Sequence, residues 1–398
     1  MVAVGTLATL VVAALASLFM AWAIGAGSSG STPFAPAVGA NAISVMRAGF
    51  IVGLLGFAGA ILQGANVTNA VGTELIGGVT LTVTAAVIAL ITAAVLVALG
   101  VFAGYPIATA FTVTGAVVGV GLAMGGDPAW AKYQQIVTLW VLVPFVGGGA
   151  AYATARMLRS EWVSETSTVP VLAGVVGVLV ANMEFAGLGA NGSSASVARA
   201  SAVELAGTMF GETVWFVASV LVAGVVAAAI VGRWVRTDQT RGQRRFLLVL
   251  GGLVAFSAGG SQVGLAIGPL VPLLDAVTVP LLALLVGGGL GLLIGSWTGA
   301  PRMIKALAQD YSSLGPRRSI AAMIPSFAIA QTAVALGVPV SFNEIIVSAI
   351  IGSGFAAGGS GVSKQKMVYT VLAWVGSLAL AFGLSYGVFT LVSNVLSV

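Results

Sequence analysis

Residues 76–102 read IGGVTLTVTAAVIALITAAVLVALGVF and contain no charged side chain. A helix of this length is longer than the hydrocarbon core of a bilayer, which is roughly 30 Å thick. The runs are too long, and alternate too little, to be strands of a membrane barrel. Similar apolar runs recur along the whole chain, near 2–24, 48–63, 76–102, 106–125, 136–156, 168–190, 210–232, 246–268, 275–297, 319–337, 340–358 and 368–396. The sequence therefore predicts an all-α membrane protein with about 12 transmembrane helices.

The composition supports this class and excludes several others. Apolar residues make up 59% of the chain and charged residues 7%, against about 25% charged in soluble domains. The absence of Cys and His excludes disulfides and the usual zinc sites, and it leaves carboxylates as the only groups for proton coupling. The net charge of +5 does not indicate nucleic-acid binding, because the positive residues lie in short loops. No Lys or Arg precedes Arg47, so residues 1–24 are interpreted as the first span rather than a signal peptide.

Two Gly/Ser-rich stretches interrupt the apolar pattern. The first, at 24–34, reads IGAGSSGSTPF, and the second, at 256–270, reads FSAGGSQVGLAIGPL. Glycine and serine in such density are unfavourable in a helix, so we expect a break at each stretch. We also expect the two breaks, at 25–34 and 259–268, to face each other.

A second matched pair follows about 80 residues after the first in each half. Residues 104–111 read GYPIATAF and residues 337–344 read GVPVSFNE, and each opens an apolar segment. The chain therefore divides into a first transmembrane repeat at 1–160, central helices with a cytoplasmic basic loop at 161–245, and a second repeat at 246–398.

The charge of the loops indicates that the two repeats have opposite orientation. Cytoplasmic loops collect Lys and Arg. Five arginines precede the second repeat, and none precedes the first. The loop at 64–75 has no positive residue, whereas its counterpart at 299–318 has four. Inverted repeats with interrupted hydrophobic segments are typical of secondary transporters. The residues counted are Arg233, Arg236, Arg241, Arg244 and Arg245 before the second repeat, and Arg302, Lys305, Arg317 and Arg318 in the later loop.

At these residues the chain resembles the PiT-type inorganic phosphate transporter family. Members carry a Gly-Ala-Asn-Asp-Val-Ala-Asn-Ala signature in each half, followed later by a Pro-Val-Ser-Thr-Thr-His segment. The second signature aligns without a gap, with Gly259, Val263 and Ala266 matching inside it. Pro106, Thr109 and the run 339–341 match the later segments. The resemblance implies phosphate transport by alternating access between the repeats.

The chain also departs from the family pattern. Gln262 replaces the Asp of the second signature. Ser28 or Ser29 replaces the Asp of the first, because this loop is one residue longer. Phe111 and Glu344 stand at the positions of the family's His. The family's Asp residues are implicated in binding the coupling cation, so sodium and proton both remain open as the coupling ion. No other cofactor and no metal site are expected.

Hydroxyl and amide groups in the motifs are the candidate anion ligands. The start of a helix presents unpaired N–H groups and a partial positive charge, and small residues let an oxyanion approach the backbone. Glu344 is the candidate proton- or ion-coupling carboxylate, because an ionisable group at membrane depth is costly. The alternatives are packing glycines and serines, ordinary helix caps and an interfacial Glu344. The candidate substrate-binding residues are Ser28, Ser29, Ser31, Thr32, Ser261, Gln262, Thr109, Ser341 and Asn343.

These observations together predict a multi-pass protein of the cell membrane that acts as a secondary active transporter for inorganic phosphate, coupled to sodium or protons. A sulfate or other oxyanion permease of the same fold and an anion channel are the alternatives. An enzyme is not expected, because the motifs contain no catalytic constellation. The expected partners are the anion and the lipid bilayer, with no nucleic acid, and a homodimer is left open.

Overall fold

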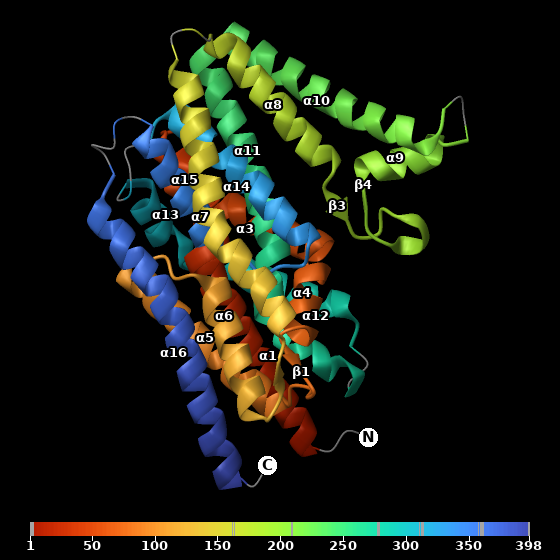
Figure 1. The fold of residues 1–398 in the computed structure, drawn as a ribbon, viewed down its shortest axis with the longest axis vertical. Helices are drawn as coiled ribbons and strands as arrows, with labels where there is room; N and C mark the ends of the chain where they lie inside the picture. The colour runs from red at the N-terminus through yellow and green to blue at the C-terminus, as the bar shows by residue number, and fades with distance from the viewer. Residues whose placement is uncertain are drawn as a thin grey trace.

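The computed structural model describes residues 4–396 except 161, 163, 208–209, 277–278, 310, 312–313, 357 and 359–361. The described chain forms an elongated helical bundle with a helical arm leaning from one side (Figure 1). The first third comprises α1 (Val4–Ile24), η1 (Gly25–Ser29), α2 (Ala35–Gly39), α3 (Val45–Gln63), α4 (Ala65–Thr73), β1 (Ile76–Gly77), α5 (Val83–Ala103), α6 (Thr109–Ala123), β2 (Asp127–Pro128) and α7 (Trp130–Arg159).

The arm and the last part of the chain complete the bundle. The arm contains α8 (Glu165–Ala181), β3 (Glu184–Phe185), η2 (Ala190–Gly192), β4 (Ala195–Ser196), α9 (Val197–Leu205) and α10 (Glu212–Thr237). The remainder contains α11 (Gln239–Ile267), η3 (Gly268–Ala276), α12 (Leu281–Thr298), α13 (Ala300–Gln309), α14 (Pro316–Ala335), α15 (Phe342–Phe355) and α16 (Lys364–Leu396). Strand β1 pairs antiparallel with β2, and β3 pairs antiparallel with β4. Each pair consists of two-residue strands and connects two loop segments rather than forming a larger sheet.

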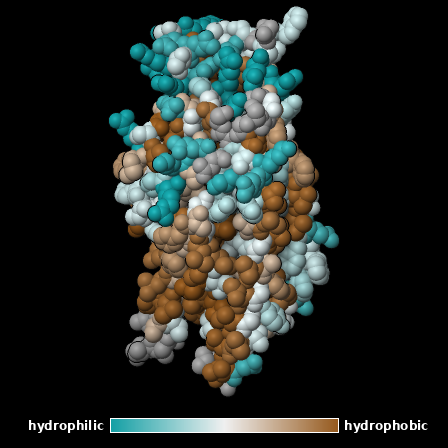
Figure 2. Space-filling view, turned by 90° about the vertical axis from the view of Figure 1, so that its left-hand side faces the viewer, coloured by the Kyte–Doolittle hydropathy of each residue, from teal (hydrophilic) through white to brown (hydrophobic). Residues whose placement is uncertain are grey.

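The prediction of a multi-pass α-helical membrane protein is confirmed. Each of the apolar runs expected to span the bilayer contains a helix. Among the described residues, eight helices are long and apolar enough to cross a membrane, and α6, α8 and α15 are apolar but shorter. Large hydrophobic side chains such as Phe145 (74% exposed) face outward. Figure 2 shows hydrophobic side chains over the middle and lower part of one face, below a hydrophilic end. The exact number of crossings stays a prediction.

Helices from the two halves pack on each other in a reciprocal pattern. α3 packs against α11 as α12 packs against α1, and α6 packs against α16 as α15 packs against α7. Trp140 Nε1 of α7 donates to Pro339 O at 3.0 Å, and Trp374 Nε1 of α16 donates to Pro106 O at 2.8 Å. α1 starts at the lower end of the bundle and α11 at the upper end (Figure 1). Two inverted repeats would produce this pattern, and the division at 160 and 245 remains our interpretation.

The expected break in the second Gly/Ser stretch is wrong over most of its length. α11 continues as an α-helix through the stretch to Ile267, and the chain changes to a 3₁₀ helix only at Gly268. The glycines instead permit close packing against α3: a Cβ on Gly259 would overlap Gly56 O, and one on Gly59 would overlap Phe256 O. Close contact through small residues is a common way for membrane helices to associate. The packing alternative therefore applies to these glycines.

The first Gly/Ser stretch does end its helix. α1 ends at Ile24 and is followed by a π-helical turn over Gly25–Ser29. A π turn accommodates one residue more than an α turn. This agrees with the first signature being one residue longer than the family pattern.

Substitution of Gly259 tests the close contact between α3 and α11. Gly259→Ala should lower the free energy of unfolding by about 1–3 kcal/mol, because overpacking forces the two backbones apart. Gly287→Ala on α12 is the matched control, since a Cβ there meets no atom within 4 Å. Thermal unfolding in detergent should distinguish the two variants, and equal melting temperatures would contradict the role assigned to the contact.

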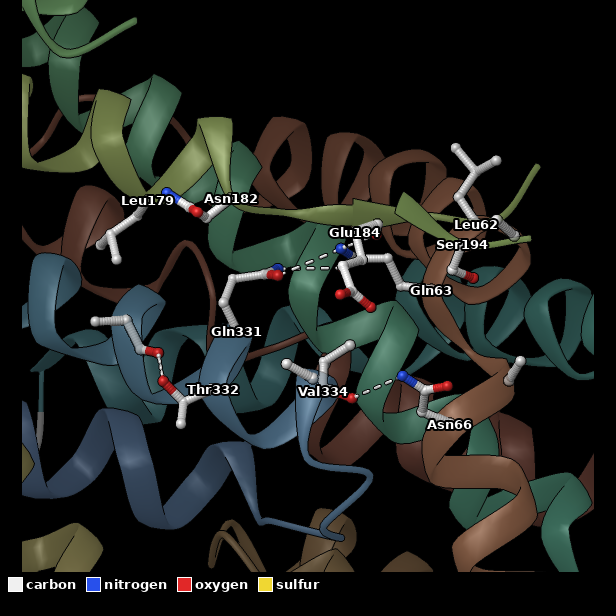
Figure 3. A pocket seen from close by; sticks show the side chains of 14 residues that line it. Leu62, Gln63, Asn66, Leu179, Asn182, Glu184, Ser194, Gln331, Thr332 and Val334 are labelled. Carbon is white, nitrogen blue, oxygen red and sulfur yellow. Dashed lines mark hydrogen bonds between the residues drawn. The ribbon is translucent and has the colours of Figure 1, made fainter. Parts of the chain in front are cut away.

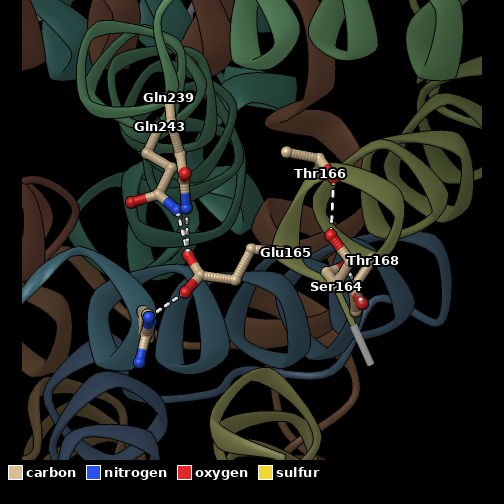
Figure 4. Close-up of polar contacts among 7 residues, drawn as sticks. Ser164, Glu165, Thr166, Thr168, Gln239 and Gln243 are labelled. Carbon is tan, nitrogen blue, oxygen red and sulfur yellow. Dashed lines mark hydrogen bonds and ion pairs between the residues drawn. The ribbon is translucent and has the colours of Figure 1, made fainter. Parts of the chain in front are cut away.

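A cluster around Glu165 fastens the arm to the last part of the chain. Glu165, at the start of α8, forms an ion pair with Arg317 of α14. It also accepts hydrogen bonds from Gln239 Nε2 at 3.0 Å and from Gln243 Nε2 at 2.5 Å, both on α11 (Figure 4). This Glu165 cluster lies at the end of the bundle that carries the arginines at the α10–α11 turn. The prediction from loop charge places that end in the cytoplasm.

Candidate functional site

Two helices begin in the middle of the bundle rather than at its surface. α6 starts at Thr109 and α15 at Phe342, and both residues are fully buried. Neither helix has a side-chain cap at its N-terminus. The first-turn N–H groups of a helix have no partner within the helix, and the macrodipole adds a partial positive charge there. Two such ends buried close together suit a negatively charged ligand.

Gln262 joins all four of the motifs singled out in the sequence. Its Oε1 accepts hydrogen bonds from Thr109 Oγ1 at 2.7 Å and from Ser28 Oγ at 3.2 Å. Its Nε2 donates to Val340 O at 2.7 Å, just before α15. One amide on α11 thus contacts η1, the start of α6 and the segment before α15. The Ser28–Gln262 hydrogen bond confirms that the two Gly/Ser stretches face each other.

Asn343 makes a second connection between the halves. Its Nδ2 donates to Ile107 O at 2.6 Å and to Gly27 O at 3.0 Å. Both carbonyls belong to motifs of the first half, whereas Asn343 lies in the first turn of α15. The amide therefore fixes the start of α15 against both of them.

Several polar atoms at this junction are fully buried and have no hydrogen-bond partner within the described residues. They are Ser29 Oγ, Ser261 Oγ, Ser341 Oγ, Asn343 Oδ1 and Glu344 Oε2. A buried polar group without a partner costs about 1–3 kcal/mol, and such groups are rare in native proteins. All five belong to the four motifs that Gln262 joins, and this indicates a site for a polar ligand. The hydroxyls can donate to an oxyanion, Asn343 Oδ1 can accept a hydrogen bond from an O–H group, and the Glu344 carboxylate can accept one or take up a proton.

Glu344 is 1% exposed, so the interfacial alternative for this residue is wrong. It lies in the first turn of α15, and because that helix starts inside the bundle, nearness to the segment's start does not mean exposure. No ion pair involves Glu344 among the described residues.

The remaining predicted residues differ in what they contact. Ser31 Oγ and Thr32 Oγ1 are buried but donate to Ser28 O at 3.2 and 3.0 Å. These two hydroxyls therefore stabilise the turn after η1. Their proposed role in binding substrate stays a prediction, and the contacts favour a structural role within the turn.

Sequence reasoning missed some groups near the site. Thr114 Oγ1 on α6 is buried without a partner, and no local pattern distinguishes it. Trp140 and Trp374, which bond the two motif prolines, hold matching places in the two halves, and this spacing was a usable signal. Phe111, at the position of the family's first His, stacks on Trp140 with ring centroids 3.8 Å apart.

Comparisons with known proteins agree with this architecture. The family model described as the phosphate transporter family matches residues 24–385. A Pyrococcus horikoshii protein named as a phosphate permease is 26% identical over 388 residues, covering 91% of this chain and 92% of the relative. The chloroplastic inorganic phosphate transporter 2-1 of Arabidopsis thaliana is 24% identical over 417 residues, covering 91% and 68%.

A solved structure named the sodium-dependent phosphate transporter has the same fold. It superimposes with a TM-score of 0.80 at 22% sequence identity, covering 97% of this chain and 99% of that chain. The fold, the order of the motifs and the family model agree: this chain belongs to the phosphate transporter family.

Proposed function

We propose that this protein is a secondary active transporter that moves inorganic phosphate by alternating access between its two halves. The observation that carries the proposal is the junction at Gln262, where four motifs meet and buried hydroxyls have no partner among the described residues. Membership of the phosphate transporter family and the names of the relatives support phosphate as the transported substrate. No Lys or Arg lies in the four motifs, so dipoles and hydrogen bonds would hold the anion and allow its release in each cycle.

The acceptor atoms in the junction favour phosphate over sulfate. Near neutral pH phosphate keeps at least one O–H group, whereas sulfate has none. Asn343 Oδ1 is buried without a donor in the described structure, as is Glu344 Oε2 while its carboxyl is ionised, and a phosphate O–H can supply one. A site with buried hydrogen-bond acceptors binds an anion without an O–H group more weakly, because those acceptors are then left unpaired.

We further propose that the coupling ion is a proton taken up by Glu344. In secondary transporters the coupling sodium ion is commonly coordinated by backbone carbonyl oxygens of unwound helix segments. The amide groups of Asn343 and Gln262 already donate to three backbone carbonyls at the junction, Gly27 O, Ile107 O and Val340 O. Glu344 is the one acidic residue in the four motifs.

Uptake of radiolabelled phosphate into proteoliposomes tests this proposal. An inward proton gradient should drive accumulation above the equilibrium level, a sodium gradient alone should not, and excess sulfate should compete poorly. Accumulation driven only by sodium would overturn the proton assignment. Phosphate flux absent under both gradients would overturn phosphate transport, and flux without accumulation would favour an anion channel.

A further inference from the structure

A polar cavity of about 180 Å³ lies outside the junction, between α3, α4, the end of α14 and the β3 hairpin (Figure 3). Its volume corresponds to roughly six waters at their liquid density, enough for a small hydrated anion. The polar residues that line it include Gln63, Asn66, Asn182, Glu184, Gln331 and Thr332.

The cavity lies away from the end of the bundle that carries the arginines. α8 starts at Glu165, which is bonded to Arg317 at that end. The same helix reaches the cavity near its other end, through Leu179 and the following Asn182. A helix of 17 residues is about 25 Å long, so the cavity lies roughly one helix length away from the Glu165 cluster at the arginine end of the bundle.

The inner wall of the cavity is a reciprocal pair of amides. Gln331 Nε2 donates to Gln63 Oε1 at 3.1 Å, and Gln63 Nε2 donates to Gln331 Oε1 at 3.3 Å. Gln63 Nε2 also donates to Glu184 O at 2.7 Å. The pair joins α3 of the first half to α14 of the second half, as Figure 3 shows. Both side chains are neutral, so the pair can separate without leaving an unpaired charge.

The amide pair also touches the helix that carries Gln262. Gln331 Nε2 donates to Ser257 Oγ of α11 at 2.6 Å. Ser261 lies one turn further along the same face of α11, and its buried hydroxyl has no partner in the described structure. A polar line therefore runs from the cavity through Gln331 and Ser257 to Ser261, beside Gln262.

We propose that this cavity is the access chamber for the anion on the side opposite the arginines, and that the Gln63–Gln331 pair is its gate. When α3 and α14 separate, the two amides exchange their mutual hydrogen bonds for bonds to water and to the passing oxyanion. The inference rests on the proposed function for the identity of the anion, but the existence of the gate can be tested without any transport.

The test uses the absence of native cysteine. Ser261→Cys places a single thiol behind the gate. It is labelled in right-side-out vesicles with a membrane-impermeant methanethiosulfonate reagent applied from the cavity side. Adding Gln331→Ala should raise the labelling rate roughly tenfold or more, because it removes the hydrogen bonds that close the pair. Gln63→Ala should do the same.

Thr332→Ala is the matched control for the gate. Thr332 follows Gln331 and lines the same cavity, but its hydroxyl donates to Ala328 O of its own helix at 2.9 Å. Its substitution should leave the labelling rate unchanged. Equal rates with and without both Gln substitutions, or the same increase in the Thr332 control, would overturn the gate.

A crosslinking experiment tests whether phosphate transport depends on opening of the gate. Gln63→Cys combined with Gln331→Cys, bridged through disulfides by a bis-methanethiosulfonate reagent, should block phosphate uptake, and a reductant should restore it by cleaving those disulfides. The control pair Ser201→Cys and Ser219→Cys, whose native hydroxyls are 2.9 Å apart between α9 and α10, should transport after bridging. Full uptake with the gate bridged would contradict the inference. If every variant lacks phosphate uptake but the labelling rates follow the prediction, the proposed function fails and the gate stands.

Discussion

Gln262→Leu should reduce phosphate uptake by about 100-fold or more while the helical bundle stays assembled. Leucine has a similar size and favours a helix, so α11 can keep its path beside α3. It cannot accept from Thr109 and Ser28 or donate to Val340 O, so the four motifs lose their common contact. The measurement is the initial rate of uptake into proteoliposomes, with thermal unfolding in detergent as the check on folding.

Gln243→Leu is the matched control for this experiment. Gln243 lies on the same helix and is also buried, but it bonds Glu165 at the arginine end. This variant should keep substantial uptake even if its melting temperature falls. Wild-type uptake in Gln262→Leu, or equal loss of uptake in the two variants, would contradict the role assigned to Gln262.

Glu344→Gln should abolish accumulation driven by a proton gradient and flatten the pH dependence of uptake. Glutamine has nearly the same shape but cannot take up a proton, so phosphate exchange can continue without coupling. In the native protein, uptake should rise as the pH on the outer side falls, because protonation of Glu344 accompanies loading. Initial rates across a pH series, with and without an imposed gradient, measure both effects.

The control for this variant is Glu204→Gln on α9, an exposed glutamate far from the four motifs. It should keep the native pH profile. An unchanged profile in Glu344→Gln would show that the carboxyl is structural. Accumulation that follows a sodium gradient equally in both variants would transfer the coupling to sodium.

The segments and their relation were predictable from sequence because each depends on a repeated local signal. Long uncharged runs identified the helices. A proline followed by Thr109 or Ser341 marked the starts of α6 and α15, which the structure buries in the middle of the bundle. Gln262 could be singled out because it replaces a signature Asp in an alignment without gaps.

Other features could not be predicted because they depend on partners far away in the chain. Glycine both weakens a helix and permits close packing, so the stretch 256–267 alone could not show that α11 continues. The contact of Gly259 with Gly56 on α3 decides the outcome. The Gln63–Gln331 pair joins amides of two helices that are 268 positions apart in the sequence, and no local pattern links them.

The location of a bound oxyanion tests most directly whether the Gln262 junction is the substrate site. Arsenate is a tetrahedral oxyanion that resembles phosphate, and its arsenic atom can be located by anomalous diffraction from crystals grown with it. We expect one strong peak between the starts of α6 and α15, within hydrogen-bond reach of the Ser29, Ser261 and Ser341 hydroxyls. A peak only in the arginine-lined cavity near Arg159 and Arg317, with none at the Gln262 junction, would contradict the assignment of the site.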